Sequence, residues 1–296
     1  MKLRRFITAI CICSLLAGCN GQSPQLNSNN TQPSVKKPSE TYMQETSQTI
    51  SNDFLQAEQG TTVTLNAFGL KQVVIREKMI ADSLSSNVFT VAYVLEDASS
   101  SSQQTYLFLK LANKFLLYEL ASKSFEDDLF LCDIDGDSIQ EIILQQCLGL
   151  SGGAGSYLSR VFRVEEETIT EIFTTSANNN YFDFDTGFDS AFLEDKKLLI
   201  TNETVNYQIV LDISSRYRDE FFDSSGKCAR DIHIWCDSFY EFIPKDIDND
   251  NIYEIVCKQY VSLDGHADGI GYAISVLKYN AEAEQFEIIE ASFSTE

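Results

Sequence analysis

Carboxylates at alternate positions mark the stretch of this chain that is best equipped for chemistry. Residues 130–144 read FLCDIDGDSIQEIIL, with three aspartates two apart and a glutamate four residues after the last. Ca²⁺ takes about six to eight oxygen ligands, so acids at positions 1, 3, 5 and 9 of a tight loop can converge on one ion, joined by the main-chain carbonyl of position 7. The residues concerned are Asp133, Asp135, Asp137, Ile139 and Glu141. The pattern indicates a calcium loop, and the alternative is an acidic turn that caps a hairpin without metal.

The flanks of this loop exclude a helical EF-hand. An EF-hand needs glycine at position 6 and a bidentate glutamate at position 12, whereas here Gly136 is at position 4 and Leu144 at position 12. Residues 129–131 and 142–144 are short apolar runs, which are typical of strands. We therefore expect a strand–loop–strand calcium site.

The acidic pattern occurs a second time. Residues 246–255, DIDNDNIYEI, are identical to residues 133–142, DIDGDSIQEI, at seven of ten positions. The glycine becomes Asn249, a residue type that tolerates the left-handed conformation glycine adopts. The second set of expected ligands is Asp246, Asp248, Asp250, Ile252 and Glu254.

The match continues beyond the acidic stretches. Tyr157, Val161 and Arg163 align with Tyr272, Val276 and Lys278 after a two-residue insertion. This similarity predicts an internal duplication, covering about residues 127–177 and 240–296.

The motif D-x-D-[GN]-D-x-x-x-E-I resembles the calcium loop of FG-GAP and VCBS repeats, which occur in integrin-like β-propellers and bacterial surface proteins. The resemblance covers the two loops and the hairpins that follow them. It implies two calcium ions, each held by the four acids and the isoleucine carbonyl of one loop. The usual family loop often has a second glycine at position 6, where this chain has Ser138 or Asn251.

The N-terminus has the features of an export signal. Basic residues precede a short apolar run that is too short to span a bilayer. Residues 16–19, LAGC, resemble a lipoprotein signal-peptidase box. That resemblance implies cleavage of residues 1–18 and lipidation of Cys19 at an extracytoplasmic membrane surface in a bacterium.

Charge and composition define the next segment. The chain has 22 Lys and Arg against 44 Asp and Glu, a net charge of −22, which disfavours nucleic acids and anionic membranes as partners. Residues 19–56 are rich in Asn, Gln, Ser, Thr and Pro, and we expect a flexible tether.

Residues 57–296 form one block of short apolar runs rich in Val, Ile, Phe and Tyr, so we expect an all-β domain. Weaker copies of the acidic pattern start near Asp82 and Asp183, and all four starts are about 50–63 residues apart. This spacing predicts a β-propeller-like array of about four four-stranded sheets, with residues 62–75 closing the ring.

The remaining polar residues favour no catalytic centre. The chain has two histidines, His233 and His266, and the five cysteines after Cys19 lack the clustered spacing of a zinc site. Cys228 and Cys236 could form a disulfide across a hairpin. We expect the other three cysteines to be buried small apolar residues.

By elimination, the sequence favours a binding or adhesion module for a glycan or a surface protein, with structural calcium. Trp235 could stack on a ligand, although a core position is favoured for it. The glycine-rich residues 151–156 and 264–271 are the expected recognition loops. The alternative is an exported carbohydrate-active enzyme, a lyase or hydrolase, on a propeller scaffold.

Overall fold

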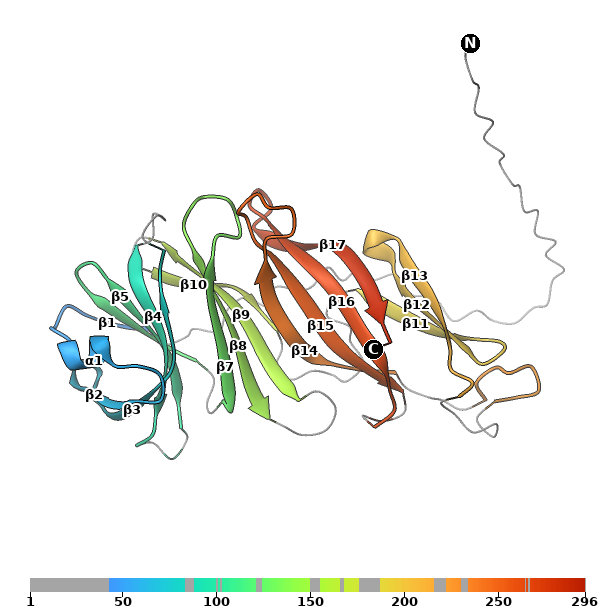
Figure 1. The fold of residues 1–296 in the computed structure, drawn as a ribbon, viewed down its shortest axis with the longest axis horizontal. Coiled ribbons are helices and arrows are strands. Elements are labelled where there is room, and N and C mark those ends of the chain that lie inside the picture. The colour runs from blue at the N-terminus through green and yellow to red at the C-terminus, as the bar shows by residue number, and fades with distance from the viewer. Residues whose placement is uncertain are drawn as a thin grey trace, which may run out of the picture. The chain divides into compact units, whose positions relative to one another are not determined.

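The computed structural model describes residues 43–82, 88–99, 101, 103–120, 124–149, 155–165, 168–175, 187–215, 222–229, 234–263, 265 and 267–295. Over these residues the chain is all-β, with four antiparallel sheets (Figure 1). The five-residue α-helix α1 is the longest helix in this part of the chain, so no described helix could cross a bilayer. The expected leader, Cys19 and the weak acidic copy at Asp183 lie outside the described residues.

The first sheet has six strands, in the order β1-β6-β5-β4-β3-β2. Its elements are β1 (Met43–Thr46), α1 (Asn52–Gln56), β2 (Thr62–Leu65), η1 (Asn66–Phe68), β3 (Leu70–Ile80), β4 (Phe89–Asp97), β5 (Thr105–Leu111) and β6 (Phe115–Glu119).

The expected tether is wrong over its last residues. Strand β1 pairs with β6, and Ser51 caps the N-terminus of α1 by accepting a hydrogen bond from the Phe54 N–H. Ile50 and Phe54 are buried in the first sheet's own core cluster. Strand pairing and two buried apolar side chains thus attach this segment to the first sheet.

Residues 62–75 do not close a ring. They form β2 and part of β3, which pair with each other in the first sheet. The turn between these strands is η1 followed by Gly69 at φ 74°, a conformation that glycine adopts without steric cost. The short turn makes β2 and β3 a local pair.

The second and fourth sheets each have four strands that are neighbours in chain order. The strands of the second sheet are β7 (Glu126–Cys132), β8 (Glu141–Gly149), β9 (Ser156–Glu165) and β10 (Thr168–Thr174). The strands of the fourth are β14 (Ile234–Lys245), β15 (Glu254–Leu263), β16 (Gly269–Asn280) and β17 (Gln285–Ser294). The expected count of four strands a sheet fits these two.

The third sheet has three strands among the described residues, in the order β11-β12-β13. They are β11 (Phe188–Leu193), β12 (Lys197–Asn202) and β13 (Tyr207–Asp212), with η2 (Glu203–Val205) before the last. The first sheet also differs from the predicted count of four strands, because it has six strands and includes β1 and β2.

The sheets do not pack in chain order. One hydrophobic cluster joins the first sheet to the second, another joins the second to the fourth, and a third joins the fourth to the third. The fourth sheet thus contacts both the second and the third sheets. It thus packs the sheet that carries the second acidic stretch against the sheet that carries the first.

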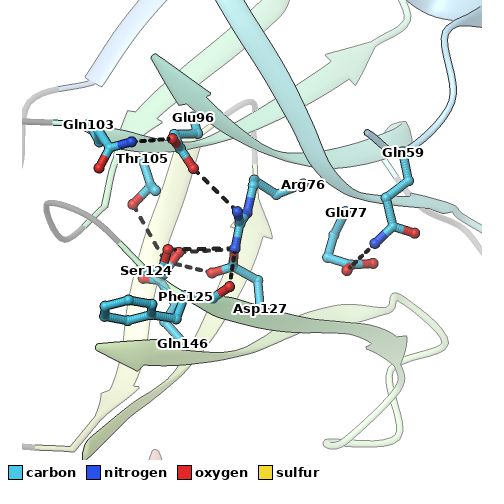
Figure 2. A network of polar contacts seen from close by, with 10 residues as sticks. All are labelled: Gln59, Arg76, Glu77, Glu96, Gln103, Thr105, Ser124, Phe125, Asp127 and Gln146. Carbon is cyan, nitrogen blue, oxygen red and sulfur yellow. Dashed lines mark hydrogen bonds and ion pairs between the residues drawn. The ribbon is translucent and has the colours of Figure 1, made fainter. Parts of the chain in front are cut away.

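A polar network also joins the first two sheets (Figure 2). The Arg76 guanidinium on β3 contacts Glu96 at 3.3 Å and Asp127 at 3.2 Å, and it donates to the Phe125 carbonyl. Ser124 and Gln146 also donate to the Asp127 carboxylate, whose side chain is 0% exposed. The buried carboxylate thus accepts hydrogen bonds from three side chains, one of them a cation.

Candidate metal centres

The two acidic stretches occupy the same place in two sheets. Loop 1, residues 133–140, joins β7 to β8, and loop 2, residues 246–253, joins β14 to β15. Glu141 and Glu254 are the first residues of β8 and β15. Each glutamate is therefore held by strand pairing, while the aspartates lie on the loop before it.

Main-chain N–H groups fold loop 1 around its aspartates. Asp133 accepts hydrogen bonds from Asp135, Gly136 and Ser138, and Asp137 accepts one from Ile139 at 2.7 Å. The Ile134 N–H donates to Glu141 at 3.1 Å. These bonds hold the loop in a tight turn around the Asp133 carboxylate.

Loop 2 repeats this arrangement. Ile247 donates to Glu254 at 3.3 Å, Asn251 to Asp246 at 3.2 Å, and Ile252 to Asp250 at 2.8 Å. Each of these three bonds has its equivalent in loop 1, so this part of the hydrogen bonding is common to the two loops.

The backbone explains the residues at positions 4 and 6. Gly136 and Asn249 both have positive φ, 83° and 63°, as the sequence comparison predicted. Ser138 and Asn251 also have positive φ, 68° and 66°. Position 6 thus adopts the left-handed conformation in both loops, although neither residue here is glycine.

The structure brings three carboxylates together in each loop. Ligand atoms of Asp133, Asp135 and Glu141 all lie within 4.8 Å of one another in loop 1. In loop 2 the group that meets this distance is Asp246, Asp248 and Asp250. Asp137 and Glu254, which the sequence also predicted as ligands, fall outside these groups.

Each loop also receives a basic side chain that sequence reasoning did not assign to the site. Arg163 on β9 contacts Asp135 through Nη2, and its Nε lies 3.5 Å from Glu141 Oε1. Lys278 on β16 lies 2.7 Å from Glu254 and 3.9 Å from Asp248. The signal was present in the duplication, where Arg163 and Lys278 align.

Loop 1 lies against the fourth sheet and against loop 2. The Tyr253 N–H donates to the Asp133 carbonyl at 2.8 Å. A Cβ built at Gly136 would lie 2.8 Å from Ile252 Cδ1, and Arg163 lies over the Tyr279 ring, 5.0 Å from its centroid. The two candidate sites are therefore in direct contact.

The two loops differ in how deeply their carboxylates are buried, and therefore in the electrostatics of these carboxylates. Burial, together with the negative charge of Asp135, raises the pKa of Glu141 to about 8. Glu141 Oε1 is buried, and no described residue donates a hydrogen bond to it. In loop 2 Asp248 is 56% exposed. Loop 1 thus holds a buried carboxylate oxygen that a cation would satisfy.

Asp82 and three of the cysteines are predicted residues that lie outside the two carboxylate groups of the described chain. The Asp82 N–H, after β3, donates a hydrogen bond to the Gln140 side chain of loop 1 at 2.8 Å. Cys132, Cys147 and Cys257 are buried, as expected of small apolar residues.

The predicted disulfide and recognition loops remain predictions. Cys236 belongs to the cluster between the third and fourth sheets, and Cys228 packs against that cluster. Trp235 is partly exposed on β14. Residues 151–154, 264 and 266 of the expected recognition loops lie outside the described residues.

The C-terminal part of the chain is similar to a known protein family. Residues 186–294 match the family described as the YybI C-terminal domain. A Bacillus subtilis (strain 168) protein named "Uncharacterized protein YybI" is 27% identical over 170 residues, which cover 55% of this chain and 61% of that protein. The chain thus matches less than two thirds of that relative's length.

Among solved structures, the chain is similar to MPT-1, a GDP-Man-dependent mannosyltransferase from Leishmania mexicana. The identity is 15%, the TM-score is 0.18, and the match covers 69% of this chain and 64% of that one. A TM-score this low carries no argument about fold or function.

Proposed function

We propose that the chain is a lipid-anchored calcium-binding protein of the bacterial surface, in which two structural calcium ions support a surface that binds a glycan or a protein. The observation that carries the calcium part is the matched pair of acidic loops. Each converges three carboxylates, and loop 1 contains a buried glutamate oxygen without a hydrogen-bond donor among the described residues.

Calcium fits these loops better than other common metals. Every converging side chain is a carboxylate, and hard oxygen donors suit Ca²⁺ and Mg²⁺ rather than Zn²⁺. Loops that offer carboxylates of different exposure suit the flexible coordination of Ca²⁺, whereas Mg²⁺ demands near-octahedral geometry.

The position of the loops favours a structural role. They lie at strand ends in the second and fourth sheets and contact each other through Tyr253 and Asp133. An ion in either loop would neutralise carboxylates at this junction. Because the unfolded chain does not hold the same ligands together, binding would stabilise the fold.

Anchoring rests on the LAGC box that ends at Cys19. Cleavage before this cysteine would remove the basic residues Lys2, Arg4 and Arg5, which makes the remaining chain more acidic. A Cys19→Ala variant of the full chain should then be lost from the membrane fraction of the producing cells. Retention of that variant in the membrane would exclude this anchor.

Support for a binding surface comes from tyrosines at one end of the fourth sheet. Tyr260 and Tyr272 are cross-strand partners whose ring centroids are 5.7 Å apart, and Tyr240 lies 6.1 Å from Tyr272. The Lys258 ammonium lies 4.4 Å from the Tyr272 centroid. Tyr240 is 38% exposed. Aromatic rings with polar tips suit stacking on sugars or anchoring a protein partner.

The propeller-like arrangement belongs to the same proposal. Four antiparallel sheets that pack on one another support it, whereas the packing order of first, second, fourth and third sheet differs from the chain order. A closed ring also needs contact between the first and third sheets. Small-angle X-ray scattering of the purified chain distinguishes a closed ring from an open row.

Thermal unfolding tests the calcium proposal. At a calcium concentration about 100 times Kd, one site contributes about 2.7 kcal/mol, which raises Tm by roughly 5–10 °C in a domain of this size. We expect about twice this rise for the wild-type chain, which has two sites, relative to EDTA, and about the one-site rise for Asp135→Ala or Asp248→Ala. Glu290→Ala, which changes an exposed acid on β17, should show the wild-type rise. Equal Tm values in calcium and EDTA would contradict the proposal.

A further inference from the structure

Both copies of the duplication place a basic side chain directly opposite the last acid of the loop. In the second sheet Ile142 pairs with Phe162, so Glu141 lies opposite Arg163. In the fourth sheet Ile255 pairs with Leu277, so Glu254 lies opposite Lys278. The same register thus delivers a positive charge to each acidic loop.

The basic groups contact the carboxylates that would hold an ion. Arg163 reaches two of the three converging carboxylates of loop 1, Asp135 and Glu141. Lys278 reaches Asp248, one of the three in loop 2, and binds Glu254 more closely. A divalent ion and these basic groups would therefore share the same carboxylates.

The contacts of Arg163 and Glu141 leave polar atoms unsatisfied. Arg163 Nε and Glu141 Oε1 are both buried and lie 3.5 Å apart, and neither has a hydrogen-bond partner among the described residues. The Tyr279 ring holds the guanidinium at a centroid distance of 5.0 Å. Arg163 thus compensates the negative charge of the loop, and Glu141 Oε1 can still bind another cation.

We propose that Arg163 and Lys278 set the metal affinity of the two loops as built-in counter-cations. Each stabilises the carboxylates of its loop when no ion is bound, and each opposes a divalent ion by electrostatic repulsion. This inference rests on the proposed calcium binding and adds what tunes it.

The two counter-cations differ in strength. The Arg163 side chain is 15% exposed and is fixed by Tyr279, whereas Lys278 is 37% exposed. Solvent screens the more exposed charge more strongly. Removing the charge of Arg163 should therefore change affinity more than removing that of Lys278.

Calcium titration of single-site proteins tests the proposal. In the Asp248→Ala background only loop 1 keeps all its carboxylates. There Arg163→Gln should tighten calcium binding at least about tenfold. Arg163→Lys keeps the charge, so its affinity should stay within about threefold of its parent. In the Asp135→Ala background, Lys278→Gln should tighten binding about threefold. Arg160→Gln removes the same charge from the same strand, where Arg160 pairs with Glu171 at 3.7 Å, and should leave affinity unchanged.

Melting in EDTA gives a second readout that does not need bound metal. Arg163→Gln should lower Tm in EDTA, because the buried carboxylates lose their counter-charge, and should gain more from calcium than its parent. Lys278 is exposed enough for its variant to fold even if Arg163→Gln does not.

Looser or unchanged binding in both glutamine variants would overturn the inference and make the basic residues positioning groups. An absence of saturable calcium binding in the wild-type chain would instead contradict the proposed function itself.

Discussion

Glu141 is the residue at which burial and charge conflict most strongly. Its side chain is 0% exposed, and burial raises its pKa from 4.5 to about 8. Between these values the unfolded chain has released a proton that the folded chain still holds. The metal-free fold therefore loses stability as pH rises from about 4.5 to about 8.

A Glu141→Gln variant separates this cost from the gain due to metal. In EDTA at pH 9 we expect it to be more stable than wild type by about 1–3 kcal/mol, because it removes the negative charge from a buried carboxylate whose Oε1 accepts no hydrogen bond from the described residues. In calcium we expect it to be less stable than wild type, because a ligand is lost. Denaturant unfolding in both buffers measures the difference in unfolding free energy between the variant and the wild type. A difference of the same sign in EDTA and in calcium would argue against Glu141 as a ligand.

At the residue scale, sequence spacing predicted much of the site. It placed the acids on strand–loop–strand turns and predicted that Asn249 adopts the conformation of Gly136, because both properties are local. It did not predict the contacts of Arg163, Lys278 and Tyr253, since these depend on strand register and on packing between sheets.

At the scale of elements, the contact between the two loops has a measurable consequence. A methyl group at Gly136 would meet Ile252, and φ there is 83°. Gly60 has a similar φ, 79°, but nothing lies within 4 Å of the Cβ position. Gly60→Ala should therefore cost about 1 kcal/mol from the backbone alone.

Gly136→Ala should cost more than Gly60→Ala, about 1–2 kcal/mol, and should weaken calcium binding in loop 2, because Ile252 has to move. Urea unfolding and a titration of Gly136→Ala in the Asp135→Ala background measure both effects. Identical losses in the two alanine variants, with unchanged loop 2 affinity, would show that the loops are independent.

The junction of the first and second sheets depends on Arg76. Replacing it with Met leaves the Asp127 carboxylate, 0% exposed, without its cation, and breaking one half of a buried pair costs about 3–5 kcal/mol. Lys114→Met removes a pair with Glu45, which is 63% exposed, and should cost at most about 1 kcal/mol. Comparable losses in chemical unfolding would mean that Asp127 is not buried as described.

The strand content and the two matched sheets followed from the sequence because alternating apolar residues and a repeated motif report local structure. The extent of the first sheet was predicted too short at its N-terminal end, since Ile50 and Phe54 are isolated apolar residues in a polar stretch. Composition alone does not distinguish such anchors from exposed ones.

At the scale of the whole molecule, the packing order of the sheets was not predictable. Core residues of β14–β17 face the second sheet through Phe242 and Ile255 and the third through Val261 and Ala273. Periodicity identifies these residues as buried, but it does not identify the sheet that covers them. The result of this packing is that both acidic loops meet at one junction.

Calorimetric titration of the purified full chain with calcium tests the central claim most directly. We predict two saturable sites in the wild type, one in Asp135→Ala or Asp248→Ala, and none in the double variant, with Glu290→Ala matching the wild type. No saturable binding in the wild type, or binding that survives in the double variant, would contradict the assignment of the two loops as calcium sites.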